Sequence, residues 1–194
     1  MSPQGILLAA GYGRRFDPDG RQDKLLAPLA DGRPVLWHSA RALADALPGS
    51  LAVIRPDQPE RARWLHEAGC RVLETPTAEA GMGHALAAAV TASAEADGWV
   101  VALADMPWLP AAAIRAVAAH LTTPSTIAAP RHAGQRGHPV GFGRAWRDRL
   151  QTLTGDHGAR AILAATTVSL FDWDDAGVLR DVDTQDDLVE RGTI

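Results

Sequence analysis

The chain has 194 residues, of which 46% are hydrophobic and 22% charged, and this length and composition are typical of one folded domain. Its formal net charge of −4 gives no electrostatic attraction to nucleic acid or to an acidic membrane surface, so neither is expected as a partner. The single cysteine, Cys70, excludes an internal disulfide, residues 1–4 do not resemble a signal peptide, and no apolar run reaches the about 18 residues of a membrane span, so a cytoplasmic location is expected.

Short apolar runs and alanine-rich segments alternate along the first two thirds of the chain. In chain order they predict a strand at 5–10, a helix at 34–47, a strand at 51–55, a helix at about 60–68, a strand at 70–74, a helix at 83–96, a strand at 98–104, a helix at 110–121 and a strand at 126–130. Strands with uninterrupted apolar residues are typical of a parallel sheet that is covered on both faces. The alternation therefore predicts an α/β fold with three layers (α/β/α) and a mostly parallel, doubly wound, Rossmann-like sheet.

The last third of the chain is less regular. Turn glycines around an extended piece at 131–142 predict a hairpin or a lid, and further segments predict helices at 144–153 and 158–165, a strand at 168–173 and a terminal helix after 181–184. Since no repeat or linker is visible, we expect a single domain over residues 1–194.

A glycine-rich turn, Gly-Tyr-Gly-Arg-Arg at 11–15, follows the first predicted strand. In open α/β sheets ligands bind beyond the carboxyl ends of the strands, where glycines let backbone N–H groups approach a phosphate and arginines add charge. A dinucleotide fingerprint would need a third glycine where Arg15 or Phe16 stands. A Walker A loop would need a serine or threonine after Lys24, but two leucines follow it. Both familiar phosphate loops are therefore excluded.

Lys24 is the only lysine in the chain, against 18 arginines. Arginine can replace most surface lysines at little cost, so a retained lysine suggests a position that needs a compact, flexible ammonium instead of a planar guanidinium.

The segment "LAAGYGRRF…DKLL" resembles the Leu-Ala-Ala-Gly-x-x-x-Arg-…-Lys-Leu-Leu signature of the MobA-like NTP transferases, and is most similar to the molybdenum cofactor cytidylyltransferases within that group. The resemblance implies a nucleotide-diphospho-sugar transferase (GT-A type) fold in which the loop wraps an NTP and Lys24 contacts its phosphates. The nucleotide-binding residues that it implies are Leu8, Ala9, Ala10, Gly11, Gly13, Arg14, Arg15, Lys24 and Gly81. Residues 16–22 make the loop longer than is usual in the family.

Asp105 follows the fourth predicted strand, on the same edge of the sheet as the glycine turn. A carboxylate there suits Mg²⁺, which usually takes one or two carboxylates together with substrate phosphates. "DMPWL" at 105–109 and "DVDTQDDL" at 181–188 resemble family segments, which implies that Asp105 and Asp183 hold the catalytic metal. For Asp183 the residues leave a second interpretation open, because Asp183 or Thr184 could also cap the helix that follows.

Two further segments, "GHPVGF" at 137–142 and "GDHGAR" at 155–160, resemble the acceptor side of the family. They imply a pocket for molybdopterin formed by His138, Pro139, Gly155, Asp156, Gly158 and Arg160. The turn at 155–158 opens a predicted helix, whose N-terminus favours an anion that Arg160 could also reach. The histidines are too scattered for a zinc site.

The resemblance implies an Mg²⁺-dependent nucleotidyltransferase, with Lys24 and Asp105 as its catalytic residues, that moves CMP from CTP to the terminal phosphate of molybdopterin and releases pyrophosphate. Its N-terminal half would bind the nucleotide and its C-terminal half the acceptor, and a molybdoenzyme that receives the product would be a transient partner. A phosphate monoester is mostly dianionic at neutral pH, so no general base is required.

Other functions stay open at this point. Family usage links Leu-Ala-Ala-Gly with cytidylyl transfer, so Ala10 favours CTP, while Leu-Ala-Gly-Gly accompanies guanylyl transfer from GTP. The acceptor could be another phosphorylated compound such as a sugar phosphate. A non-catalytic chaperone that carries the finished cofactor and a nicotinamide oxidoreductase fit the residues less well.

Overall fold

The structure is a computed structural model that describes residues 2–13, 15–17 and 22–188. Within these residues an 8-stranded sheet runs in the order β3-β2-β1-β4-β7-β5-β6, with β8 paired to β5. The strands are β1 (Gln4–Leu8), β2 (Leu51–Ile54), β3 (Arg71–Glu74), β4 (Gly98–Leu103), β5 (Ile127–His132), β6 (Gln135–Arg136), β7 (Val140–Gly143) and β8 (Ser169–Asp172).

Parallel pairing dominates the N-terminal half of the sheet, as the sequence predicts. β1 pairs in parallel with β2 and β4, and β2 with β3, so that Ile6 faces Leu51 on one side and Val101 on the other. β8 is parallel to β5, while β7 runs antiparallel to both β4 and β5. The predicted doubly wound α/β fold is confirmed, with an antiparallel insertion at β7.

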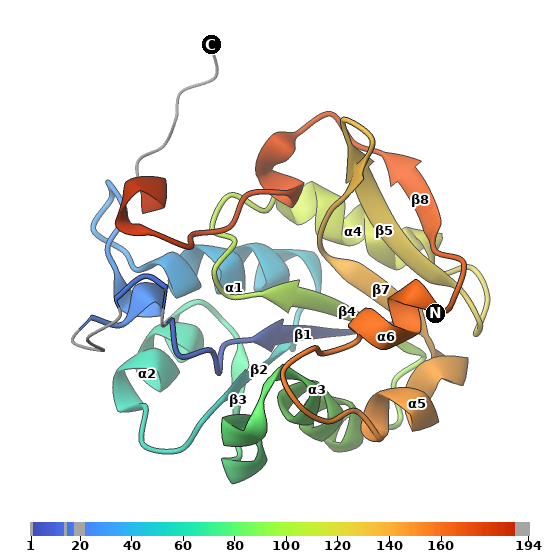
Figure 1. Ribbon diagram of the computed structural model, residues 1–194, viewed down its shortest axis with the longest axis horizontal. Coiled ribbons are helices and arrows are strands. Elements are labelled where there is room, and N and C mark those ends of the chain that lie inside the picture. The colour runs from blue at the N-terminus through green and yellow to red at the C-terminus, as the bar shows by residue number, and fades with distance from the viewer. Residues whose placement is uncertain (1, 14, 18–21, 189–194) are drawn as a thin grey trace.

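Helices cover both faces of the sheet. They are α1 (Val35–Ala46), α2 (Pro59–Glu67), α3 (Met82–Ala92), α4 (Ala111–His120), α5 (Arg147–Gln151) and α6 (Arg160–Ala164). Figure 1 shows α1 and α4 on one side of the sheet and α3 and α5 on the other. Along β1, Leu7 belongs to the core with α1, α2 and α4, whereas Ile6 belongs to the core with α3, α5 and α6. Because successive side chains of a strand point to opposite faces, both faces need apolar residues, which explains the uninterrupted apolar runs.

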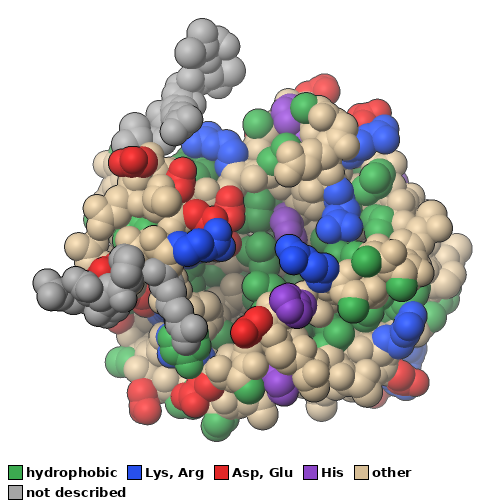
Figure 2. Space-filling model, in the orientation of Figure 1, with side chains coloured by type: hydrophobic (Ala, Val, Ile, Leu, Met, Phe, Trp, Pro, Cys, Tyr) green, Lys and Arg blue, Asp and Glu red, His purple; other side chains and the backbone are tan. Residues whose placement is uncertain are grey.

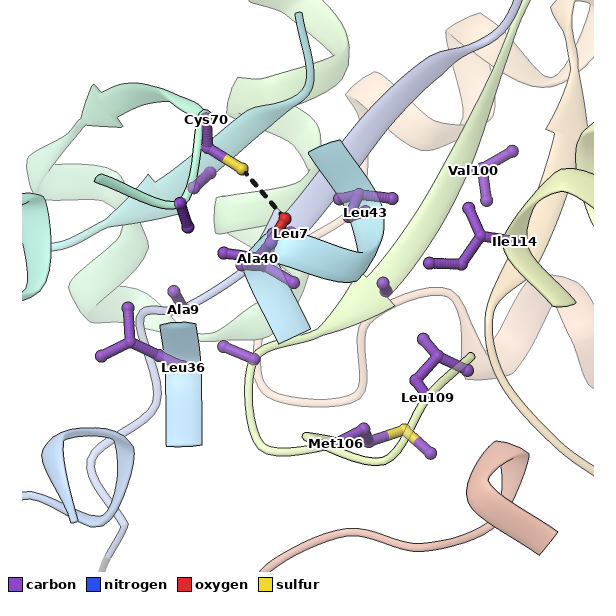
Figure 3. Packing of buried hydrophobic residues seen from close by; sticks show 14 of the residues in the cluster. Leu7, Ala9, Leu36, Ala40, Leu43, Cys70, Val100, Met106, Leu109 and Ile114 are labelled. Atoms are coloured by element: carbon purple, nitrogen blue, oxygen red, sulfur yellow. Dashed lines mark hydrogen bonds between the residues drawn. The ribbon is translucent and has the colours of Figure 1, made fainter. Parts of the chain in front are cut away.

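The core on the α1 side is drawn in Figure 3, where Leu7, Leu43 and Ile114 lie between the sheet and its helices. Each such fully buried side chain contributes about 1.5–3 kcal/mol to the free energy of unfolding. Cys70 lies in this layer, and its Sγ donates to the Ala40 carbonyl at 3.6 Å. Burial raises the pKa of the Cys70 thiol to about 11, so this cysteine is a packing residue and not a nucleophile.

The predicted boundaries are less accurate in the last third. The helix predicted at 158–165 begins later, because α6 starts at Arg160. Gly155 and Gly158 have positive φ angles of 70° and 52°, which are not helical. The predicted hairpin exists between β5 and β6, with Ala133 and Gly134 at its turn. The predicted terminal helix is a 3₁₀ turn at Gln185–Leu188, and the other 3₁₀ turns are Lys24–Leu26, Pro76–Ala80, Arg144–Trp146 and Ala176–Val178. None of the helices in the described part of the chain is long and apolar enough to cross a membrane.

Candidate active site

Lys24 and Asp105 meet at the carboxyl edge of the sheet although they lie 81 positions apart in the sequence. Lys24 Nζ donates to Asp105 Oδ2 at 2.7 Å, and the two side chains are 12% and 23% exposed. β4 ends at Leu103, and the backbone beyond it is fixed because the Ala104 N–H donates to the Leu8 carbonyl and Ser39 Oγ donates to the Ala104 carbonyl. The predicted juxtaposition of the lone lysine and this carboxylate is present in the structure.

The glycine turn lies against the side chain of Lys24. Gly13 has a φ of 65°, and a Cβ atom at this position would lie 3.0 Å from Lys24 Cβ. Glycine is therefore needed both for the backbone conformation and for the close approach of the lysine stem. The Asp23 side chain caps the 3₁₀ turn that begins at Lys24 by accepting from the Leu25 N–H at 2.9 Å.

Three carboxylates, those of Asp105, Asp181 and Asp183, each place one oxygen within 4.8 Å of the others. Asp105 and Asp183 are expected from the sequence, whereas Asp181 is not. Val182, which is fully buried, lies between the two aspartates, and its N–H donates to the Asp105 carbonyl at 2.8 Å. In an extended segment, residues i and i+2 share a side, so the buried valine turns both aspartates toward Asp105. That alternation is the sequence signal that could have identified Asp181.

The Asp183 side chain does not cap the last turn, so the second interpretation left open by the sequence does not hold for it. Its carboxylate accepts from Arg15 Nη1 at 2.6 Å and lies 3.7 Å from Lys24 Nζ. The turn is instead closed by Asp187, whose carboxylate accepts from the N–H groups of Asp183 and Thr184.

The carboxylate cluster has the character of a site for a hard divalent cation. Desolvation, and then the negative charges of Asp183 and Asp105, raise the pKa of the Asp181 carboxyl. Asp105 Oδ1 is buried and has no hydrogen-bond partner in the described part of the chain. A cation with oxygen ligands would relieve both the crowding of charge and the unpaired oxygen. The donor set therefore fits a divalent metal ion.

A cleft runs from the glycine turn across Lys24 and Asp105. It is lined by Leu8, Ala10, Gly11, Tyr12, Gly13, Lys24, Leu25, Ala78, Gly81, Met82, Ala85, Leu103, Asp105 and Asp156. Two of the residues implied for nucleotide binding lie elsewhere: the Ala9 methyl is buried in the α1 core and Arg15 lies on Asp183. Arg14 falls outside the described residues.

A second pocket adjoins the first, because Leu8, Met82, Leu103 and Asp156 line both. Four of the residues implied for the acceptor line it, namely His138, Asp156, Gly158 and Arg160. Arg136 is a further cation of the lining that is not expected from the sequence. Gly155 does not line this pocket. It connects the turn at 155–158 to α3, because its N–H donates to His84 Nδ1 and its carbonyl accepts from the Gly83 N–H. Pro139 is buried and is not among the residues that line this pocket. Figure 2 shows this face hollowed, with acidic and basic side chains on one side of the hollow and histidine and basic side chains on the other.

His138 is uncharged in this pocket at neutral pH. Burial lowers the pKa of His138 to about 4, and the charge of Asp105 opposes this shift only partly. Its Nδ1 is buried without a hydrogen-bond partner among the described residues, and its backbone N–H donates to the Val178 carbonyl at 2.8 Å. The ring can offer a hydrogen bond to a ligand but does not carry a charge.

Fold and site together define a nucleotide-binding α/β protein with a lysine, a carboxylate cluster and two adjoining pockets at the carboxyl edge of its sheet. Residues 5–170 match the MobA-like NTP transferase domain, and the chain belongs to this family of nucleotidyltransferases.

Similar proteins cover nearly the whole chain. Purine catabolism protein PucB of Bacillus subtilis is 30% identical over 96% of this chain and 95% of its own length. The crystal structure of Rv0371c from Mycobacterium tuberculosis is 26% identical, covers 96% of both chains and has a TM-score of 0.78, and Rv0371c has also been solved in complex with manganese. The nucleotidyl transferase Mth528 from Methanothermobacter shares the fold, with a TM-score of 0.80 at 22% identity over 96% of this chain and 94% of its own.

Proposed function

We propose that this protein is a cytoplasmic enzyme that transfers CMP from CTP to the terminal phosphate of a molybdopterin-type acceptor and releases pyrophosphate. The observation that carries the proposal is the contact between Lys24 and Asp105 on the floor of a cleft that opens directly into a pocket with two arginines. A triphosphate in the first space and a phosphate in the second would place the reacting groups side by side.

The residues of the first cleft suit the triphosphate. Backbone N–H groups of the glycine turn and the Lys24 ammonium would bind phosphate oxygens and neutralise charge that develops on the leaving pyrophosphate. Asp105, Asp181 and Asp183 would hold the divalent ion, for which we propose Mg²⁺. When bound, that ion supplies further charge neutralisation at the phosphates. The manganese complex of Rv0371c supports a divalent ion in this family.

The second pocket suits a flat ring system that carries a phosphate. Met82, Phe142 and Leu163 give it apolar walls, and Arg136 and Arg160 supply cations for the phosphate. Because the phosphate monoester is already mostly dianionic, it can attack without a general base. A His138 whose pKa is lowered to about 4 agrees with this, because so weak a base does not take up a proton at neutral pH. The protein then acts by positioning two anions and by neutralising their charge.

The choice of CTP over GTP is supported by the side chains near the glycine turn. Ala10 lines the cleft together with Ala78 and Ala85, and its methyl group takes space that a glycine would leave open. This alanine belongs to the Leu-Ala-Ala-Gly segment, which family usage links with cytidylyl transfer. A molybdoenzyme that accepts the product is the partner that we expect at the following step.

The direct test is to incubate the protein with Mg²⁺, molybdopterin and each NTP in turn, and to measure pyrophosphate. We expect release with CTP, and we expect Lys24→Ala and Asp105→Ala each to lower kcat by about 10²–10³-fold or more, since each removes a preorganised charge. Arg41→Ala is the matched control, because Arg41 lies on the exposed side of α1 and pairs only with Asp45 in the described structure.

Circular dichroism should show that the Lys24 and Asp105 variants remain folded. Near-normal turnover by either of them would contradict the assignment of the site. Pyrophosphate release with GTP alone would contradict the assignment of the nucleotide.

A further inference from the structure

Arg61, on α2, is buried with 2% of its surface exposed, and it makes four hydrogen bonds that all reach the loop around the cleft. Its Nε donates to Asp23 Oδ2 at 2.6 Å and its Nη2 to Asp23 Oδ1 at 2.8 Å. Its Nη1 donates to the Ala9 carbonyl at 2.6 Å, and Nη2 also donates to the Gly11 carbonyl at 3.0 Å. One guanidinium therefore holds both ends of the loop that contains the glycine turn.

The first end of this loop is oriented through its carbonyl groups. Arg61 donates hydrogen bonds to the Ala9 and Gly11 carbonyls, and Arg55 Nε donates to the Ala10 carbonyl between them at 2.9 Å. In a trans peptide the N–H of the next residue points opposite to the carbonyl. The negative ends of three consecutive peptide groups are thus turned toward arginines, and the corresponding N–H groups are turned away from them.

The second end of the loop carries Lys24. The Asp23 carboxylate accepts hydrogen bonds from both Arg61 and the Leu25 N–H. The guanidinium therefore also fixes the 3₁₀ turn that begins at Lys24. Gly13 then packs against Lys24 Cβ. A shift of Asp23 relative to Gly11 would change the distance between the glycine turn and the ammonium. Arg61 itself does not line the cleft.

We propose that Arg61 is a positioning residue of the nucleotide site: it binds the carbonyls of Ala9 and Gly11 and the carboxylate of Asp23 through one guanidinium, and so sets the separation between the phosphate-binding N–H groups and the Lys24 ammonium. The inference rests on the proposed function, because it assigns Lys24 to the phosphates. A planar, bidentate guanidinium can make all four bonds at once, whereas a lysine cannot. Buried ion pairs are often no more stabilising than apolar packing, so stability alone does not account for this one.

The test is a double-mutant cycle in which Arg61→Lys and Lys24→Ala are made singly and together. Binding of CTP with Mg²⁺ is measured by titration calorimetry, and kcat by pyrophosphate release. We expect Arg61→Lys to raise the Kd for CTP about tenfold and to lower kcat by up to about 100-fold, which is the cost of a displacement of about 1 Å at a reacting centre. In the Lys24→Ala background the same change should alter Kd by less than about threefold, because residues that act through one another are not additive.

Arg63→Lys is the matched control, since Arg63 lies two positions further along α2, is 59% exposed and pairs with Glu67. It should leave Kd and kcat unchanged. Asp23→Asn is the second variant if Arg61→Lys does not fold, because it keeps an acceptor for the guanidinium but removes the charge that the pair shares. It should show the same coupling to Lys24→Ala.

Equal effects of Arg61→Lys in both backgrounds would overturn the proposal, as would wild-type affinity in a folded Arg61→Lys protein. If both the Arg61 and the Asp23 variant are unfolded, the pair serves stability and the proposal is also overturned. A wild type that binds CTP but releases no pyrophosphate with molybdopterin contradicts the proposed acceptor alone, and the cycle on CTP binding still decides the role of Arg61.

Discussion

Around Asp105 the site holds charges of both signs at close range. Lys24 Nζ lies close to the carboxylates of both Asp105 and Asp183. Arg15 forms an ion pair with the other carboxylate oxygen of Asp183, Oδ2. Asp105 and Asp183 are thus each paired with a cation. A triphosphate that draws Lys24 and Arg15 toward its own oxygens would free the carboxylates for a divalent ion. Nucleotide and metal should therefore bind more tightly together than either does alone.

His138 gives the clearest prediction about pH at this scale. In the folded protein burial lowers its pKa to about 4, whereas the unfolded chain should titrate near the usual value of about 6.5. Between these values the unfolded state binds more protons, so the free energy of unfolding must fall as the pH falls. At about pH 5 the contribution of His138 should be about 2 kcal/mol less favourable than at about pH 8.

Urea unfolding of the wild type and of His138→Phe at both pH values measures this difference. The variant should lose less stability than the wild type on acidification, because phenylalanine has no proton to bind. His66→Phe, at an exposed position on α2, is the control. It should lose as much stability as the wild type when the pH is lowered. Identical pH dependence of the His138 variant and the wild type would contradict a buried, uncharged ring.

Single residues differ in how far the sequence reveals them. Lys24 stands out because no other lysine competes with it, and Asp105 because a buried strand directs it to the edge of the sheet. Arg136 is not distinguished in this way, because an arginine in a hairpin is a common surface residue, and Asp181 is marked only by its alternation with the apolar Val182. Arg61 looks like any exposed helical arginine until the packing of α2 shows that it faces the loop.

Among the elements, the contact between the start of α3 and the turn at 155–158 determines how the two pockets meet. Gly81 precedes α3 with a φ of 124°, and a Cβ atom there would clash with Asp156 Oδ1 and would lie 2.6 Å from the carbonyl carbon of Gly155. Gly83 donates its N–H to the Gly155 carbonyl at 2.8 Å. The turn that carries Asp156 is therefore seated on glycines at the N-terminus of α3.

Gly81→Ala should consequently lower the free energy of unfolding by about 2 kcal/mol or more, because the backbone conformation is strained for alanine and the neighbouring atom is backbone that cannot move aside cheaply. Urea titration measures the loss. Gly11→Ala is the matched control: Gly11 also lines the cleft, but a Cβ atom there meets nothing within 4 Å. Its stability should change by no more than about 0.5 kcal/mol. Equal losses in the two variants would show that the contact with the 155–158 turn contributes nothing.

The long elements could be predicted because their pattern repeats over several turns or fills a whole strand, as in α1 and β4. The short helices α5 and α6 have only five residues each. A period of 3.6 residues is hardly sampled in so short a segment, so tertiary contacts decide between an α-helical and a 3₁₀ turn. The terminal turn at 185–188 belongs to this class, and its closure by Asp187 is a local hydrogen-bond choice that composition does not reveal.

For the whole molecule, the sequence predicts two halves with different ligands within one domain, and the sheet shows how they are joined. β4 lies at the centre of the sheet. It pairs with β1 of the N-terminal half, where Gln4 is opposite Trp99 and Leu8 is opposite Leu103. On its other side it pairs with β7 of the C-terminal half, where Gly98 is opposite Gly143 and Val101 is opposite Val140. Trp99, fully buried, packs in the same core as Phe142 of β7 and Ile6 of β1. Neither half can lose its strands without exposing the core of the other.

We therefore expect a single cooperative unfolding transition in urea, with coincident midpoints for far-ultraviolet circular dichroism and for tryptophan fluorescence. CTP with Mg²⁺ should shift both midpoints to higher urea concentration together. At a ligand concentration of about 100 times its Kd, the free energy of unfolding should rise by about 2.7 kcal/mol. Hydrogen exchange should show the same protection in β7 as in β1, although only β1 leads into the glycine turn. Two separate transitions, or protection confined to β1 and β2, would mean that the halves fold independently. In that case the separation of the two pockets would depend on a flexible joint and not on the shared central strand.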